Sequence, residues 1–497
     1  MSPQTRKVPL SFAGLILGPA LAATLYFILP DHYVNSQGVM TELGASGRAA
    51  AAAGIWMAVW WMTEAIPIYA TALLPLVLFP LAGIASVSAA AAPYGHHLIY
   101  LFLGGFIIAR SLEKWNLHRR MALLALQHVG TRPSFILAGF MAVTALLSMW
   151  VSNTATAMMM LPIALSVISW IESKENSSAV SFAPALLLAV AYAASIGGMG
   201  TIIGTPPNLF LVSFLKEHAG IEVSFAGWMG IGLPIVLIFL PIVWFMLTRV
   251  LYRLDGPPVS KGKSLCRREY AALGPVSRGE KNTFIVFIIT ALLWMTRPLI
   301  NAVSLAGTRP FAGLTDTGIA VLGALSLFII PVDRKKKIFT MDWPTAAGLP
   351  WGVLLLFGGG LSLAAALEAN GVSLFLGAKV SGWQGIHGIV VVLLVTALMI
   401  YLTELTSNTA STVTFVPILL AASKGLGLHP LSLTVPAALA ASCAFMLPVA
   451  TPPNAIVFGS GRLSMGHMVR AGFWLNIMGI ILITLLGYSL VIPVLSQ

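Results

Sequence analysis

Two copies of a short polar motif are the residues best suited to bind ions in this sequence. Ser152-Asn153-Thr154 and Ser407-Asn408-Thr409 each stand between two apolar runs. Ser, Asn and Thr favour helix N-caps and turns, so each motif predicts the tip of a helical hairpin. The start of a helix exposes backbone N–H groups and a positive dipole end, which suit a carboxylate. The side-chain oxygens could ligate a small hard cation.

A second motif, Thr205-Pro206-Pro207-Asn208, returns as Thr451-Pro452-Pro453-Asn454. Proline has no N–H and interrupts a helix. The carbonyl groups just before each motif, at Gly204 and Ala450, are therefore expected to lose their intrahelical partners. Inside a bilayer they need another partner, and a sodium ion is a good candidate.

These motifs belong to an internal repeat. A shift of 255 residues places Ser152-Asn153-Thr154 on Ser407-Asn408-Thr409, Phe102 on Phe357, and Ser148 on Thr403. The Thr-Pro-Pro-Asn motifs align in the same order after a nine-residue gap. Weak two-fold repeats are typical of secondary transporters, whose sites lie near broken helices at the midplane. If each repeat crosses the membrane an odd number of times, the two are inverted.

The composition requires a membrane protein. Of 497 residues, 58% are hydrophobic and 9% are charged, against about 25% charged in soluble domains. This excludes a soluble enzyme, a disordered scaffold and a nucleic-acid binder. The net charge of +12 is explained by basic cytoplasmic loops. Two cysteines, Cys266 and Cys443, form no disulfide framework or metal cluster.

The apolar runs predict about 11 transmembrane helices, plus two re-entrant hairpins that must be buried in protein or face water. The runs cover residues 10–29, 48–66, 68–85, 96–113, 157–171, 182–200, 228–251, 282–302, 317–332, 349–369, 385–402, 410–423, 431–449 and 470–495.

Basic residues set the expected orientation. They cluster in 249–281 and again in 334–337, and both clusters should be cytoplasmic. Arg6 and Lys7 place the N-terminus inside, and an odd number of spans places the C-terminus outside. Residues 114–120 suggest an amphipathic arm at the cytoplasmic interface, anchored by Trp115. Short loops favour a bacterial inner membrane.

Acidic residues are sparse in the apolar segments, which disfavours a proton relay. Glu113 and Glu368 end equivalent helices, where capping or ion pairing is expected. Glu404 lies four residues before Asn408, and both a structural and a functional role remain open for it. Arg297 is expected to snorkel toward water. No nucleophile, phosphate-binding or zinc motif is present, which disfavours an enzyme.

Further motifs complete a resemblance. They are Trp60-Trp61-Met62-Thr63-Glu64-Ala65-Ile66-Pro67, Gly104-Gly105-Phe106 and Lys114-Trp115-Asn116-Leu117-His118. With the paired motifs, the sequence resembles the divalent anion:sodium symporter (DASS) family, in its sodium-coupled dicarboxylate branch. The resemblance implies an all-α polytopic fold with 11 spans and two re-entrant hairpins in two inverted repeats. It also implies a homodimer in the lipid bilayer, with a transport domain that moves as an elevator.

The resemblance implies a division into scaffold and transport parts. The expected segments are scaffold 1–128, transport 129–250, a basic cytoplasmic loop 251–281, scaffold 282–370 and transport 371–497.

The resemblance also implies the site residues. The first sodium site would use Ser148, Ser152, Asn153 and Gly204, and the second Thr403, Thr406, Asn408 and Ala450. The substrate would meet Asn153, Thr154, Thr205, Pro206, Asn408, Thr409, Thr451 and Pro452. Na⁺ is the co-transported ion, and no organic cofactor is implied.

The predicted function is sodium-driven import of C4-dicarboxylates such as succinate, fumarate and malate. A dicarboxylate carries two negative charges and the motifs offer no Arg or Lys, so sodium ions would supply the positive charge. The alternatives are an anion exchanger, or a sulfate or citrate carrier, of the same fold. From other classes, the alternatives are a channel, a Na⁺/H⁺ antiporter or a membrane-embedded enzyme.

Overall fold

The computed structural model describes residues 8–35, 38–172, 179–254, 262–304, 308–382 and 385–495, which are mainly helical. Its strands form two antiparallel ribbons. One pairs β1 (His32–Val34) with β2 (Met40–Glu42), and the other pairs β3 (Pro331–Asp333) with β4 (Ile338–Phe339). The all-α prediction is confirmed. Arg6 and Lys7, on which the expected N-terminal orientation depends, lie outside the described residues.

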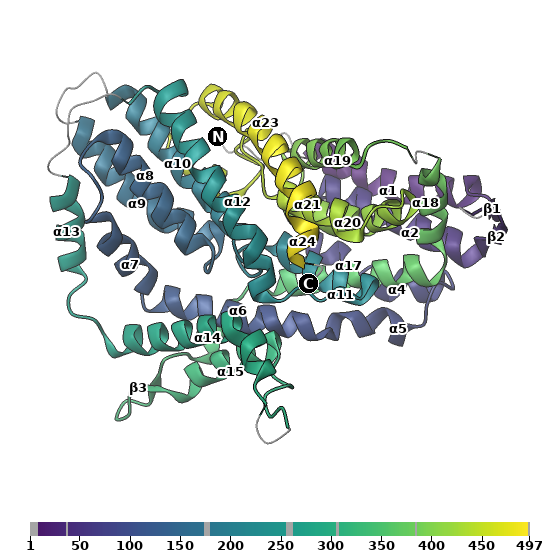
Figure 1. Ribbon diagram of the computed structural model, residues 1–497, viewed down its shortest axis with the longest axis horizontal. Coiled ribbons are helices and arrows are strands. Elements are labelled where there is room, and N and C mark those ends of the chain that lie inside the picture. Colours follow the sequence, from purple (N-terminus) through teal and green to yellow (C-terminus); the bar gives the residue numbers. More distant parts are fainter. Residues whose placement is uncertain are drawn as a thin grey trace.

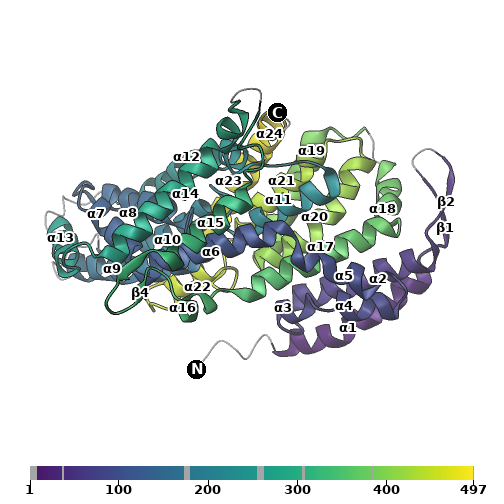
Figure 2. The same cartoon turned by 90° about the horizontal axis from the view of Figure 1, so that it is seen from below.

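The helical elements follow one another along the whole chain (Figures 1 and 2). They are α1 (Val8–Ile28), α2 (Gly44–Thr63), α3 (Ile68–Thr71), α4 (Pro75–Leu81), α5 (Val87–Ala91), η2 (Ala92–Gly95), α6 (His97–Lys114), α7 (Leu117–Leu126), α8 (Pro133–Ser148), α9 (Asn153–Glu172), α10 (Ala179–Gly198), α11 (Pro206–Ala219), α12 (Phe225–Phe245), η3 (Met246–Leu251), α13 (Gly262–Ala272), α14 (Arg278–Ala302), α15 (Asp316–Ile329), α16 (Trp343–Ala347), α17 (Trp351–Ala369), α18 (Val372–Ser381), α19 (Gly388–Thr403), α20 (Asn408–Gly425), α21 (Pro430–Ala441), α22 (Pro452–Phe458), α23 (Met465–Ser489) and α24 (Val491–Leu495).

Seven helical segments of the described chain are long and apolar enough to cross a membrane. They are Ser11–Ile28, Val87–Lys114, Ser181–Gly198, Phe225–Leu251, Arg278–Ala302, Trp351–Ala369 and Met465–Ser489. Other apolar helices are shorter, and the count of 11 spans stays a prediction. The apolar runs missed α8 and α18, because 16 and 10 residues fall short of the roughly 20 that a full span needs.

Each repeat contains a helical hairpin followed by a broken helix. The first repeat has the hairpin α8–α9 and the broken pair α10–α11, and the second has α19–α20 and α21–α22. Figure 1 shows the first hairpin on the left and α20 on the right. The repeats interlock, because α11 packs on α20 and α21 while α22 packs on α9 and α10. Residues from both halves of the sequence therefore build one central region.

The two repeats are inverted. His96, just before α6, has Nε2 at 3.2 Å from Glu217 Oε2. The next residue, His218, has Nδ1 at 2.6 Å from Glu368 Oε2, near the end of α17. The start of α6 and the end of its repeat partner α17 therefore lie at the same end of the molecule. The helices also touch, since the ring centroids of Phe102 and Phe357 are 4.7 Å apart.

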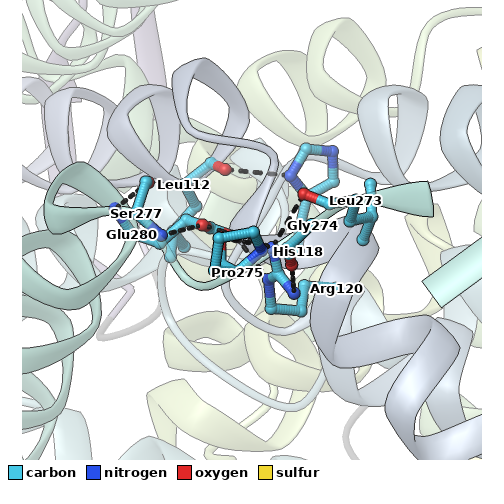
Figure 3. A network of polar contacts seen from close by, with 8 residues as sticks. All are labelled: Leu112, His118, Arg120, Leu273, Gly274, Pro275, Ser277 and Glu280. Carbon is cyan, nitrogen blue, oxygen red and sulfur yellow. Dashed lines mark hydrogen bonds and ion pairs between the residues drawn. The ribbon is translucent and has the colours of Figure 1, made fainter. Parts of the chain in front are cut away.

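The opposite end of α6 is held by a different polar layer. Arg120 in α7 forms a buried ion pair with Glu280, with Nε at 2.5 Å from Oε1. Figure 3 shows that the same guanidinium also reaches the carbonyl groups before α14, including Gly274 at 3.0 Å. Lys114 bonds to Asp342, and this hydrogen bond lowers the pKa of Asp342 below its ordinary value.

The expected arm over residues 114–120 is only partly correct. Helix α6 ends at Lys114, and residues 115–116 form a turn in which Asn116 has a positive φ of 53°. The amphipathic helix is α7. Trp115 Nε1 donates to the Thr340 carbonyl at 2.7 Å, and the expected position of this side chain at the membrane interface stays a prediction. Helix α13 occupies part of the expected basic loop 251–281, of which residues 255–261 lie outside the described chain.

Three charged residues in or beside the apolar segments have ion-pair partners. Arg297 Nε lies 2.8 Å from Asp316 Oδ1, and both side chains are 12% exposed; its expected snorkelling stays a prediction. Ion pairing was correctly expected for Glu113, which contacts Arg110, and for Glu368. Pairing lowers the cost of holding these charges near the apolar region.

Candidate ion and substrate site

Both Ser-Asn-Thr motifs form hairpin tips, as predicted. Helix α8 ends at Ser148 and α9 begins at Asn153, and Ser152 Oγ accepts a hydrogen bond from the Ala155 N–H at 3.2 Å. In the second repeat, Ser407 Oγ accepts from the Ala410 N–H at 3.5 Å. Each serine therefore caps the returning helix, and each asparagine is its first residue.

Three oxygen atoms converge at the first tip. Ser148 Oγ lies 2.6 Å from Asn153 Oδ1 and 2.7 Å from the carbonyl oxygen of Ala194. A hydroxyl has one hydrogen to donate, so it can satisfy one of these two acceptors at a time. The surplus of neutral oxygens is the donor set that a small hard cation prefers.

The second tip repeats this arrangement. Thr403 Oγ1 lies 2.6 Å from Asn408 Oδ1 and 2.9 Å from the carbonyl oxygen of Ala441. A different hydroxyl residue thus reaches the same two kinds of acceptor. The predicted pairing of Ser148 with Thr403 therefore holds at the level of individual contacts.

The Thr-Pro-Pro-Asn motifs begin helices after a break. Helix α11 starts at Pro206, where a missing N–H costs nothing. Thr205 before it is extended, with φ −147° and ψ 144°. Asn208 Nδ2 donates to the carbonyls of Gly198 and Thr201, at 3.0 and 2.9 Å. This asparagine therefore ties the end of α10 to the start of α11.

The second motif has the same backbone arrangement, and its threonine hydroxyl also accepts from the Asn454 N–H at 3.3 Å. Thr451 has φ −140° and ψ 150° before α22, and Asn454 Nδ2 donates to the Ala444 and Leu447 carbonyls at 3.0 Å each. This clamping role of both asparagines was missed from the sequence. The signal was present, because each copy of the motif ends in Asn at the same distance from its prolines.

The structure brings the tips and breaks together. A Cβ atom on Gly198 would lie 2.6 Å from Asn153 Oδ1, so the end of α10 touches the first tip. Because Asn208 also bonds to Gly198, the tip, the break and the start of α11 form one cluster. Gly204 and Ala450 are buried directly before the two extended threonines, which are each 4% exposed.

The other predicted site residues differ in burial and in their hydrogen bonds. Thr406 Oγ1 donates to the Leu402 carbonyl at 2.9 Å and lies 2.6 Å from Ser411 Oγ. The solvent-accessible positions lie at or next to helix starts. Ser152 and Pro452 are exposed, whereas Thr154, Pro206 and Thr409 are half-buried.

Comparison with known proteins identifies the family. Residues 39–496 match the family described as sodium:sulfate symporter transmembrane region. The chain belongs to this family. It is 43% identical over 490 residues to the sodium-dependent dicarboxylate transporter SdcS of Staphylococcus saprophyticus, covering 97% of this chain and 92% of that protein. It is 42% identical over 497 residues to SdcS of Staphylococcus aureus, covering 98% and 93%.

Solved structures share the fold at low identity. The YdaH transporter of Alcanivorax borkumensis has a TM-score of 0.59 at 15% identity, covering 97% of each chain. MtrF of Neisseria gonorrhoeae, described with a class of antimetabolite efflux pumps, has a TM-score of 0.61 at 12% identity, covering 99% of this chain and 95% of that one. The predicted DASS resemblance is confirmed, and the chain is a multi-pass membrane transporter rather than an enzyme.

The sequence left the role of Glu404 open, and the structure shows its contacts. Its Oε1 accepts from the N–H groups of Phe445 and Met446 at 2.7 and 2.8 Å, and its Oε2 accepts from Leu447 N–H at 3.1 Å. Asn476 Nδ2 adds a fourth donor at 2.8 Å. The carboxylate is 3% exposed and holds the break between α21 and α22.

The chemistry of the site is that of neutral oxygens. In the described part of the chain, no group of three or more His, Cys, Asp or Glu side chains could hold a metal ion. Hydroxyl, amide and carbonyl oxygens at the tips suit a hard monovalent cation better than a transition metal. The residues present therefore fit sodium as a transported ion.

Proposed function

We propose that this chain imports C4-dicarboxylates, such as succinate, fumarate and malate, together with Na⁺. The observation that carries the proposal is the repeated oxygen cluster, in which Ser148 and Asn153 correspond to Thr403 and Asn408. The names of the SdcS relatives, which are sodium-dependent dicarboxylate transporters, support the same substrate and ion.

The two cation sites would share one construction. The first uses Ser148, Ser152, Asn153 and Gly204, and the second uses Thr403, Thr406, Asn408 and Ala450. Each site combines a tip with the break loop that packs against it, so a bound Na⁺ would bridge two separate elements. Ion binding would thereby order the tips.

The anion would bind between the tips. Helices α9 and α20 start at the two asparagines, while α11 and α22 start at Pro206 and Pro452. The starts of α9 and α20 supply N–H groups and positive dipole ends for the two carboxylates. The starts of α11 and α22 lack the first two N–H groups, because prolines occupy these positions. Thr154, Thr205, Thr409 and Thr451 would add hydroxyl donors.

Coupling follows from charge. A dicarboxylate brings two negative charges into a low-dielectric region where unpaired charge is costly. The motifs provide no Lys or Arg, so Na⁺ supplies the compensating charge. Binding of the anion then requires the ion, and the sodium gradient drives uptake.

The proposed movement is an elevator motion of residues 129–250 and 371–497 against a scaffold of 1–128 and 282–370. The contacts of Glu217 and His218 with His96 and Glu368 join these parts at one end of the molecule. We further propose a homodimer in the inner membrane with the N-terminus cytoplasmic and the C-terminus outside, as the basic clusters and the family resemblance suggest.

Radiolabelled succinate uptake into proteoliposomes tests the function. An inward Na⁺ gradient is compared with equal choline and K⁺ gradients. Uptake with Na⁺ alone is expected. Sodium-independent uptake that requires internal dicarboxylate would replace the symporter with the exchanger. The family description names sulfate, so labelled sulfate and citrate form parallel arms, and transport of either without succinate would reassign the substrate.

A further inference from the structure

The two cation sites differ in formal charge at one aligned position. Met149 follows Ser148 in the first repeat, whereas Glu404 follows Thr403 in the second. Both residues link a hairpin tip to the neighbouring break loop. Met149 does this through its carbonyl oxygen, which accepts from Thr201 Oγ1 at 2.5 Å. Glu404 uses its carboxylate, so only the second link carries a formal charge.

In every described hydrogen bond of the Glu404 carboxylate, the partner is the donor and the carboxylate is the acceptor. This is the pattern of an ionised acid. Among the described residues, no Lys, Arg or His lies within ion-pair distance of it. It is also the only Asp or Glu in residues 371–497. A buried charge without a counter-charge is costly, and the adjacent residue Thr403 belongs to the second oxygen cluster.

The carboxylate also fixes the geometry of that site. The break loop runs from Ala441, held by Thr403, to Ala450, and Glu404 binds the N–H groups of 445–447 in its middle. In the first repeat, the aligned N–H groups of Met199 and Gly200 instead bond to the end of their own helix α10. Ser148, Asn153 and Gly204 of the first site correspond to Thr403, Asn408 and Ala450 of the second, whereas Ser152 and Thr406 do not align with each other. The formal charge next to the two sites differs as well.

We infer that the second site binds Na⁺ first and more tightly, because Glu404 supplies a negative charge that the first site lacks. The inference rests on the proposed sodium-coupled function. Coulomb attraction is strong where water is scarce. A buried charge beside only one of two similar oxygen clusters therefore decides which site binds Na⁺ first. Glu404 is a positioning residue, since it acts through the loop and its field rather than by touching the ion.

The first test compares proteins that retain one site. Asn153→Ala leaves the second site and Asn408→Ala leaves the first. Na⁺ is titrated against thermal unfolding in detergent without dicarboxylate, with choline keeping the ionic strength constant. The half-maximal Na⁺ concentration should be at least about tenfold lower in Asn153→Ala. Equal values, or the reverse order, would overturn the inference.

The second test removes the charge. Glu404→Gln should raise the half-maximal Na⁺ concentration about tenfold in the Asn153→Ala background and less than about twofold in the Asn408→Ala background. Glu113→Gln removes a carboxylate from the scaffold and is the matched control, expected to change neither. A similar effect of Glu404→Gln in both backgrounds would reveal a merely structural role.

These outcomes are separable from failure of the proposed function. If Na⁺ stabilises wild-type protein no better than choline, sodium coupling itself falls and the inference falls with it. If Na⁺ stabilises wild type but the sites bind equally, only the inference falls. The comparison of the two single-site proteins decides the matter even if Glu404→Gln does not fold.

Discussion

At the scale of single residues, the tip asparagines are the most informative positions. Asn153 and Asn408 each start a helix and each offer Oδ1 to a neighbouring hydroxyl. Asn153→Ala or Asn408→Ala removes one oxygen from a cation site, so sodium-dependent uptake should fall at least about 100-fold while the protein still folds. Proteoliposome uptake measures the effect, and size-exclusion chromatography checks folding.

Asn301→Ala is the control for these variants. Asn301 donates to the Leu314 carbonyl at 3.1 Å outside the proposed site, so its loss should leave uptake within about twofold. Wild-type transport by either tip variant would remove that asparagine from the site.

The clamping asparagines are expected to affect stability. Asn454→Ala would leave the carbonyls of Ala444 and Leu447 without the side-chain donor that each now has. Because buried acceptors without partners cost about 1–3 kcal/mol each, the free energy of unfolding should fall by at least about 2 kcal/mol. Thermal unfolding gives the shift. An Asn454→Ala protein as stable as wild type would mean that water replaces the clamp.

Among the elements, the contact between a tip and a break decides whether a site forms. Gly198 ends α10 against Asn153, so a side chain there must displace the amide. Gly198→Ala should therefore raise the Na⁺ concentration needed for half-maximal thermal stabilisation about tenfold. At Gly95 a Cβ meets nothing within 4 Å, and Gly95→Ala should match wild type. Equal Na⁺ titrations for the two variants would contradict the close approach.

For the molecule as a whole, the elevator proposal requires the contact between α11 and α17 to open during transport. In a background with Cys266→Ser and Cys443→Ala, the pair His218→Cys and Glu368→Cys should be crosslinked by a short bis-methanethiosulfonate reagent. The replaced side chains reach each other, and the reagent spans the gap that the shorter cysteines leave. Crosslinking should then stop succinate uptake, and reduction should restore it.

The control crosslink lies within the scaffold. Lys114→Cys with Asp342→Cys joins two residues that also touch but are proposed to move together. Crosslinking of this pair by the same reagent should leave uptake unchanged. If the His218–Glu368 crosslink also leaves uptake unchanged, these two parts do not separate during the cycle.

Composition and local motifs were enough to predict the membrane environment, the repeat and the turning points of the chain. The membrane follows from composition, because too few charges remain to cover a soluble surface. The turning points follow from local stereochemistry, because Ser-Asn-Thr caps a helix and Pro-Pro starts one. Ser148 and Thr403 were paired correctly because the repeat keeps their spacing from Asn153 and Asn408.

Only the tertiary structure shows which distant elements contact each other. Inversion of the repeats depends on helix direction, which Glu217 and His218 reveal through contacts with distant residues. The pairing of Arg297 with Asp316 and of Glu404 with the 445–447 loop joins segments that are separate in sequence. Hydrogen bonds between such segments depend on packing in three dimensions, and no local pattern of apolar and polar residues encodes them.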